Sequence, residues 1–187
     1  MEEPYVHKIF LVKQELKGPF LLRKHGFLNE IDIHKSKSLG MDKAVFTYPI
    51  KHYSEDHTEG RNSEDSMGTI GENFAVLEMD EFTVFIGDTF RMGEAIIQVS
   101  QPGPVTAKHL QNGLNTGWYF RVVQEGEIRG GTDLELIDRP YPQWSIAACT
   151  EVIFLDKHNL RAADELYSCE LLGGIWRNSL RKRLRGF

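Results

Sequence analysis

The segment that decides the fold is a run of short apolar stretches broken by turn residues. Residues 83–102 read TVFIGDTFRMGEAIIQVSQP. β-Branched and aromatic residues fill positions 83–86 and make up most of 95–99, and Gly87, Asp88 and Gly93 lie between them. Such apolar residues favour extended strands, whereas glycine and aspartate favour turns. The segment therefore predicts strands that are joined by tight turns.

The same pattern extends over the first 140 residues of the chain. Further strands are expected at residues 6–12, 44–48, 118–123 and 134–137. Six or more short strands of this kind are typical of a barrel or a sandwich. Residues 54–71, rich in acidic and small polar side chains, are expected to form a long exposed loop, and His52 and His57 beside it are expected at the surface. The sequence thus predicts a mainly β domain over residues 1–140.

The pattern becomes helical after Pro140 and Pro142. Three short helices are expected, because apolar residues recur at helical spacing. They are Ile146, Cys149 and Ile153, then Leu160, Ala163 and Tyr167, then Trp176, Leu180 and Leu184. Asn159 is expected to cap the second helix, and Gly173 with Gly174 to separate the second from the third. We therefore expect a helical tail over residues 141–187.

Composition excludes several classes of protein. The formal charge is −5, from 22 basic and 27 acidic side chains, which gives no general attraction for nucleic acid or acidic membranes. No apolar stretch approaches the length of a membrane span, and the start of the chain lacks a signal-peptide pattern. Cys149 and Cys169 are too few for a disulfide framework. A cytoplasmic, reduced location is expected, and the basic end around Arg177, Arg181 and Arg183 is expected to stabilise the last helix.

Several short motifs follow one another at fixed intervals. They are Gly71-Glu72-Asn73-Phe74, Ile86-Gly87-Asp88, Gly93-Glu94-Ala95, Gln98-Val99-Ser100-Gln101-Pro102, and Gly117-Trp118-Tyr119 followed by Arg121. Their order and spacing resemble the MOSC domain family, the C-terminal domain of molybdenum-cofactor sulfurases. The resemblance is to the bacterial type that is linked to resistance against N-hydroxylated base analogues, and the last 45 residues look like the three-helix tail of that type.

The resemblance implies a MOSC β-barrel that binds the molybdenum cofactor, a pterin dithiolene that carries the metal and a phosphate. In the family a cysteine thiolate is a further ligand of the metal. Members reduce N-hydroxylated substrates or handle sulfur for the cofactor. A thiolate is a soft and strong donor to such a metal, and cationic side chains with backbone amides hold a phosphate.

The sequence departs from the family pattern at the expected site. Aligning Lys108 with the lysine of the family puts Thr106 at the position of the cysteine, and no cysteine lies within forty residues of it. The family's histidine upstream of Asp42 and Lys43 is absent, and Gly103 replaces a frequent arginine. A threonine hydroxyl is far less acidic than a thiol, so it ligates only where a highly charged metal helps to remove its proton.

Two classes of function follow from these residues. In the first, the chain is an enzyme or a sulfur-handling protein that binds the molybdenum cofactor, with Thr106 as the candidate metal ligand and Asp88 as a second catalytic candidate. In the second, it is a non-catalytic module that binds a pterin, another small anionic ligand or an unidentified protein partner. The candidate cofactor-binding residues are Lys43, Asn73, Lys108 and Arg121, and His109 is a further cation near them.

Overall fold

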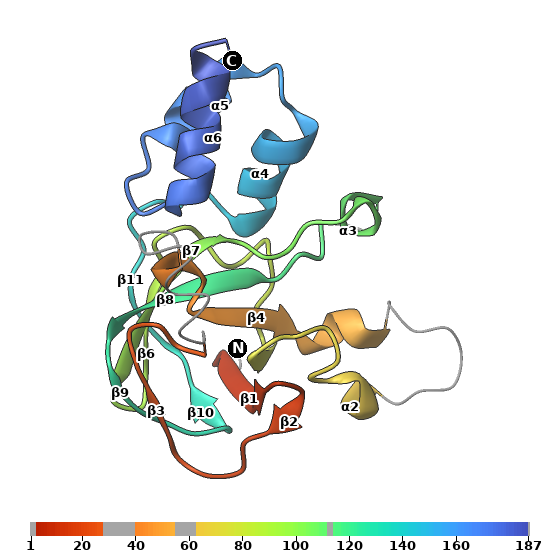
Figure 1. Cartoon of the computed structure of the whole chain (residues 1–187), viewed down its shortest axis with the longest axis vertical. Coiled ribbons are helices and arrows are strands. Elements are labelled where there is room, and N and C mark those ends of the chain that lie inside the picture. The colour runs from red at the N-terminus through yellow and green to blue at the C-terminus, as the bar shows by residue number, and fades with distance from the viewer. Residues whose placement is uncertain (1–2, 28–39, 55–62, 112–113, 187) are drawn as a thin grey trace.

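The computed structural model describes residues 3–27, 40–54, 63–111 and 114–186, as a β-rich body with helices at one end (Figure 1). The strands are β1 (Tyr5–Leu11), β2 (Gln14–Glu15), β3 (Phe20–Leu22), β4 (Val45–Pro49), β5 (Phe74–Leu77), β6 (Thr89–Met92), β7 (Ala95–Pro102), β8 (Trp118–Gln124), β9 (Gly126–Ile128), β10 (Thr132–Asp133) and β11 (Glu135–Asp138). The helical segments are η1 (Met41–Lys43), η2 (Ile50–Ser54), α2 (Ser63–Ser66), α3 (Ala107–Gln111), α4 (Ile146–Thr150), η3 (Glu151–Leu155), α5 (Leu160–Tyr167) and α6 (Gly174–Leu184).

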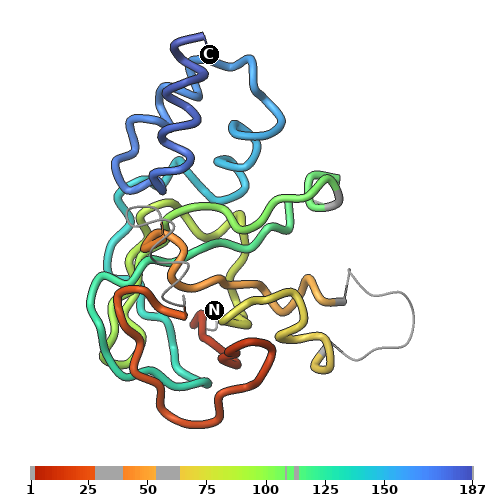
Figure 2. The backbone as a smooth tube through the Cα atoms, in the orientation of Figure 1, coloured from red at the N-terminus to blue at the C-terminus, as the bar shows by residue number. Residues whose placement is uncertain are grey.

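The main sheet closes on itself. Its strands follow the order β10-β1-β5-β4-β8-β7-β6-β11, and β4 and β5 form the parallel pair. The two end strands are successive segments of the chain, because only Leu134 separates β10 from β11. The N–H of Leu134 donates to the carbonyl of Pro4 at 2.7 Å, which extends the pairing beside β1. The predicted mainly β barrel with a short helical tail is confirmed, and Figure 2 traces the path of the chain through it.

Strand alternation divides β8 between core and site. Trp118, Phe120 and Val122 are buried inside the barrel, as expected of side chains at a period of two. Burial of one such side chain stabilises the fold by about 1.5–3 kcal/mol. Tyr119 and Arg121 consequently point out of the barrel, on the side where η1 packs.

Most of the predicted strands are confirmed, but one is wrong. Residues 6–12, 44–48, 95–99, 118–123 and 134–137 fall on β1, β4, β7, β8 and β11. Residues 83–86 instead form a turn with one isolated bridge, from Phe85 to Ser145. The physical reason is that the Asp80 carboxylate accepts hydrogen bonds from the backbone N–H groups of Phe82 and Thr83, at 2.8 and 2.9 Å. Such local acceptors compete with strand pairing.

The predicted exposed loop at 54–71 is only partly wrong where it is described: residues 64–65 and 69–71 are exposed, and residues 55–62 lie outside the described part. Ser63–Ser66 form α2, and Met67 and Gly68 are buried. The carboxylate of Glu72 accepts hydrogen bonds from the Gly68 N–H and the Tyr53 hydroxyl. This buried network holds the segment against the barrel, because buried polar groups need such partners.

The tail has the predicted helices, and the prediction that Asn159 caps the second helix is confirmed. The side chain of Asn159 accepts from the N–H of Ala162 at the start of α5. The barrel and the tail share one hydrophobic core, which includes Val99 and Leu166. The boundary at residue 140 stays a prediction. In the described part of the chain, no helix is long and apolar enough to cross a membrane.

The start of α6 joins the tail to the barrel. The N–H of Gly173 donates to the carbonyl of Ser100 at 2.8 Å, and the N–H of Gly174 donates to Asp42 Oδ2 at 2.9 Å. A side chain at Gly173 would meet Gln101 Oε1 at 2.3 Å. Glycine at this position therefore allows the close approach of the two parts.

Candidate functional site

Two of the predicted site residues, Lys43 and Asn73, line the same hollow. We call it the aromatic hollow, and its volume is about 350 Å³. It lies where η1, the start of β5 and the loop after β7 meet. Its walls include Phe27, Lys43, Phe46, Asn73, Pro104 and Tyr119.

The aromatic hollow combines ring surfaces with one cation. The Lys43 ammonium lies 5.7 Å from the centre of the Tyr119 ring, and the rings of Tyr119 and Phe46 lie 5.2 Å apart. Burial raises the pKa of the Tyr119 hydroxyl, which therefore stays protonated near neutral pH. The hollow thus offers aromatic faces, an ammonium group and a hydroxyl donor.

Asn73 shapes the wall of this hollow through its bonds to the backbone. Its Oδ1 accepts from the N–H of Phe46 at 2.9 Å, and its amide nitrogen donates to the carbonyl of Phe10 at 3.3 Å. The side-chain amide thus links β4 to β1 just before β5 begins. A cofactor-binding role for Asn73 stays a prediction, because these two bonds are structural.

Thr106 is the last residue of the loop that follows β7 and directly precedes α3. Its side chain is exposed, and its Oγ1 accepts from the N–H of His109 at 3.4 Å, as a helix-capping residue does. His109 Nδ1 lies 2.9 Å from the carbonyl of Pro104. Lys108 also belongs to α3, and its side chain lies outside the described part of the structure.

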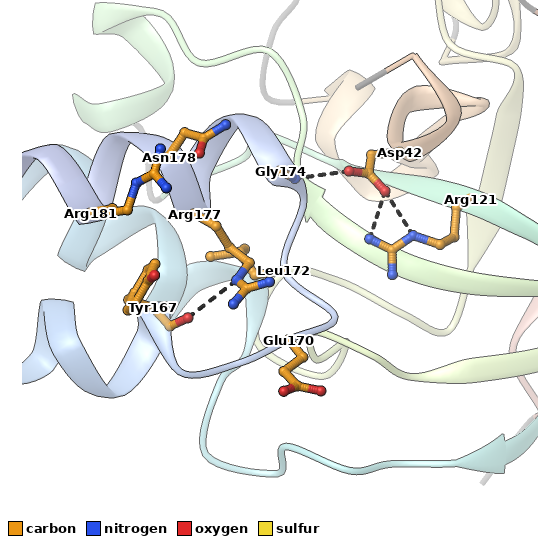
Figure 3. Close-up of a pocket in the computed structure, with 9 residues that line it drawn as sticks. All are labelled: Asp42, Arg121, Tyr167, Glu170, Leu172, Gly174, Arg177, Asn178 and Arg181. Atoms are coloured by element: carbon orange, nitrogen blue, oxygen red, sulfur yellow. Dashed lines mark hydrogen bonds and ion pairs between the residues drawn. The ribbon is translucent and has the colours of Figure 1, made fainter. Parts of the chain in front are cut away.

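Arg121 lies in a different place from Lys43, so the predicted single basic pocket is divided. It lines a cleft between the barrel and the tail, which we call the joint cleft (Figure 3). The guanidinium of Arg121 binds Asp42 Oδ1 at 2.8 and 2.9 Å. It also donates to Gln98 Oε1 and to the carbonyl of Leu171, each at 2.8 Å. Arg121 and Asp42 therefore hold the tail to the barrel.

Asp88 is fully buried and lines neither hollow. Its two oxygens accept from Arg139 at 2.8 Å each, and Oδ2 accepts from the N–H of Phe85 at 3.0 Å. The Arg139 guanidinium also lies 4.3 Å from the centre of the Phe85 ring. Burial raises the pKa of Asp88, although the bonds from Arg139 oppose that shift. A catalytic role for Asp88 stays a prediction, and its position is that of a structural ion pair.

The structure contains a buried pair that sequence reasoning missed. His52 was expected at the surface, yet its Nε2 lies 2.8 Å from Glu81 Oε2, and both side chains are buried. Glu81 Oε1 accepts from the N–H of Gly117 at 2.7 Å, directly before β8. Since β8 carries Tyr119, this pair supports one wall of the aromatic hollow. His52 and Glu81 are separated by 29 in sequence number, and no local pattern indicated their contact.

Comparison with known proteins connects this geometry to a family. The model of the MOSC domain matches residues 34–105, and that of the YiiM-like, 3-alpha helix domain matches residues 144–187. The uncharacterized protein YflK of Bacillus subtilis (strain 168) is 32% identical, over 92% of this chain and 83% of YflK. The chain belongs to the MOSC domain family.

Two further proteins are similar to this MOSC protein. A protein named "Reductase" of Gibberella moniliformis is 29% identical over 84% of this chain, and the match covers 35% of the fungal protein. The crystal structure of YiiM from Geobacillus stearothermophilus superposes with a TM-score of 0.81 at 26% identity. The match covers 97% of this chain and 99% of that structure. The similarity therefore includes both the barrel and the tail.

The two cysteines of this chain are poor candidates for the thiolate ligand that the family cofactor uses. Cys149, in α4, and Cys169, between α5 and α6, are both buried in the tail, and neither lines the aromatic hollow. Burial raises the pKa of Cys149 well above its usual value and that of Cys169 to about 11, so both remain thiols. Among the described residues no group of three histidine, cysteine or acidic side chains is placed to hold a metal ion. The donor set does not fit the metal end of the family cofactor.

The replacement of the family's arginine by Gly103 has a structural reason. Gly103 is buried, and its N–H donates to the carbonyl of Gly117 at 2.9 Å. A Cβ at this position would lie 2.1 Å from the carbonyl oxygen of Thr116 and 2.8 Å from the Phe46 ring. No side chain fits this backbone, so the loop that leads to Thr106 follows a path that requires glycine.

Proposed function

We propose that this MOSC protein binds a flat, anionic ring compound of the pterin class in the aromatic hollow, without a thiolate–metal bond. The observation that carries the proposal is the Lys43 ammonium, held 5.7 Å from the centre of the Tyr119 ring in a hollow that Phe46 and Pro104 also line. Family membership supports a pterin as the ring. The protein then acts as a binding module, because Thr106 caps a helix at the position where the family has its metal-ligating cysteine.

The chemistry of the hollow selects such a ligand by two features. Aromatic side chains stack on the face of a flat ring, which adds about 0.5–1.5 kcal/mol to the burial of apolar area. An ammonium group at the edge of the hollow binds a carboxylate or phosphate substituent through charge-assisted hydrogen bonds. Phe46 and Tyr119 supply the first feature, and Lys43 supplies the second. The Tyr119 hydroxyl adds a donor for a ring oxygen or nitrogen.

Titration with 6-carboxypterin tests this proposal, because its fluorescence reports binding directly. The Lys43→Ala variant is expected to bind about tenfold more weakly, which corresponds to about 1.4 kcal/mol for the loss of one charge-assisted contact. Lys157→Ala, which removes an exposed lysine of the tail, is the matched control and is expected to bind like the natural sequence. Equal affinity of the two variants, or no binding by the natural sequence, would contradict the proposal.

A second candidate is reduction of N-hydroxylated compounds with the molybdenum cofactor. The relative named "Reductase" favours this candidate, because it is 29% identical over 84% of this chain. The candidate requires a ligand other than thiolate or a metal held by the pterin alone, and the described residues supply no such ligand set.

Molybdenum content after purification from a host that makes the cofactor separates the two candidates. The natural sequence is expected to carry little metal, and Thr106→Cys is expected to raise the metal content severalfold if the ligand is the missing part. Ser179→Cys, an exposed position on α6, controls for metal that binds to any new thiol. Stoichiometric molybdenum in the natural sequence would restore the reductase candidate. Unchanged content in Thr106→Cys would show that more than the ligand has been lost.

A further inference from the structure

The joint cleft is a second cavity, separate from the aromatic hollow. It has a volume of about 480 Å³ and lies between η1 and β8 of the barrel and α5 and α6 of the tail. Its residues include Asp42, Arg121, Tyr167, Glu170, Arg177 and Arg181. It shares no lining residue with the aromatic hollow, and consecutive residues of η1, Asp42 and Lys43, belong to the two different cavities.

The floor of the joint cleft is electrically balanced. One oxygen of Asp42 accepts from Arg121 at 2.8 Å, and its other oxygen accepts from the N–H of Gly174 at 2.9 Å. Arg121 also donates to Gln98 and to the carbonyl of Leu171. Asp42 and Arg121 consequently build the cleft and have little binding capacity to spare.

The wall formed by α6 carries cations that are not used in this way. Arg177 and Arg181 are four residues apart, so they project from the same face of the helix. Arg177 donates through Nε to the carbonyl of Tyr167 at 3.3 Å. The guanidinium carbon of Arg177 lies 5.4 Å from the centre of the Tyr167 ring. Neither the terminal nitrogens of Arg177 nor the side chain of Arg181 has an acidic partner among the described residues. In Figure 3 both side chains lie along the cleft, and Arg177 is between Arg181 and Glu170.

Arg183, on the same helix, has a structural role. Arg183 donates to the carbonyls of Val152 and Ile153 at 2.8 and 2.7 Å, and thereby ties α6 to η3. Arg183 fits the expectation that the basic end stabilises the last helix. Arg181 also lies in the last turn of α6, but both it and Arg177 line the joint cleft, and neither ties α6 to η3 as Arg183 does.

We propose that the joint cleft binds the phosphate group of a small molecule through Arg177 and Arg181. A guanidinium presents paired N–H donors that match two oxygens of one phosphate, and two arginines one helical turn apart complement its double negative charge. Asn178, which also lines the cleft, adds an amide donor beside them. The site goes beyond the proposed function, because it uses neither Lys43 nor the aromatic hollow.

Calorimetric titration of the full chain at low ionic strength, with glycerol 3-phosphate and separately with inorganic phosphate, tests this site. The Arg177→Ala/Arg181→Ala double variant is expected to bind at least tenfold more weakly than the natural sequence. Lys182→Ala/Arg185→Ala removes two positive charges from the same end of the chain outside the cleft, and it is expected to bind within twofold of the natural sequence. Thermal unfolding of each variant verifies that α6 remains folded.

The possible outcomes separate site binding from general charge. Selective loss in the Arg177/Arg181 variant supports the site, and the tighter of the two probes identifies a phosphate ester or the free ion as its ligand. Equal loss in both double variants would assign the binding to net charge and overturn the proposal, as would an absence of binding by the natural sequence. Lys43→Ala is expected to bind both phosphate probes normally, so failure of the aromatic-hollow proposal and failure of this one are distinguishable.

Discussion

Replacement of Glu81 by alanine is expected to lower the free energy of unfolding by about 3–5 kcal/mol, because it leaves buried groups without their partner. Glu81 is fully buried, and its two oxygens lie 2.8 Å from His52 Nε2 and 2.7 Å from the Gly117 nitrogen. Without the Glu81 carboxylate, the His52 ring and the Gly117 N–H stay buried and have no replacement for this partner. The free-energy cost of removing these two groups from water is then not offset by a hydrogen bond. Urea unfolding followed by tryptophan fluorescence measures the change, since Trp118 lies next to Gly117.

Two further variants make the Glu81 experiment specific. Glu81→Gln retains an acceptor for Gly117 and a side chain of the same shape, and it is expected to lose clearly less stability than Glu81→Ala. Glu127→Ala removes an exposed acid from β9 and is expected to change stability by about 0.5 kcal/mol or less. A loss of about 1 kcal/mol or less in Glu81→Ala, a range typical of ordinary single hydrogen bonds, would refute the supporting role of the His52–Glu81 pair.

Restoring the family's arginine at position 103 is expected to destabilise this protein by about 3 kcal/mol or more, through overpacking at a fully enclosed backbone position. A Cβ there would lie 2.1 Å from the Thr116 oxygen, so the strand and the facing turn must separate before any side chain fits. Gly103→Arg therefore breaks the bond from the Gly103 N–H to the Gly117 carbonyl as well. Soluble yield and urea unfolding report the effect.

Gly18 provides the matched control for this substitution. A Cβ at Gly18 meets no atom within 4 Å, so Gly18→Arg adds the same side chain at an open position. It is expected to change stability by about 0.5 kcal/mol or less. If Gly103→Arg were as stable as Gly18→Arg, the loop from Gly103 to Thr106 would have to move easily, and steric exclusion would not explain this departure from the family.

Local pattern predicted strands that are runs of apolar residues, such as β4, and strands that alternate, such as β8. The alternation in β8 and in the first half of β7 follows from one buried and one outward face, and it is visible without knowledge of the partner strands. β3 and β9 are three residues each, and they pair across about a hundred positions of the chain. Their pairing arises from the closure of the whole barrel, which no local pattern contains. The error at 83–86 has a local cause, the carboxylate of Asp80.

The sequence could not show how the predicted site residues divide between the two cavities, and the roles assigned to them stay predictions. Lys43 and Asn73 do share a hollow, as expected. Arg121 binds Asp42, and it therefore lies in the cavity that Asp42 lines. Asp42 and Lys43 line different cavities because consecutive residues of the 3₁₀ turn η1 point in different directions. Asp42 therefore faces Arg121 and α6, while Lys43 faces Tyr119. The pairing of Asp88 with Arg139 likewise depends on strand β11 lying beside β6, which a motif cannot reveal.

β10 and β11 are successive segments joined at Leu134. The first segment pairs with β1, and the second pairs with β6. In an open sheet the outermost strands present rows of unpaired N–H and C=O groups, to which a strand from another molecule can add. In the described part of this chain, the strand at one end of the main sheet continues as the strand at the other end. In the described residues, a strand from another copy therefore cannot add to the main sheet beyond β10 or β11, because these two end strands are one continuous segment.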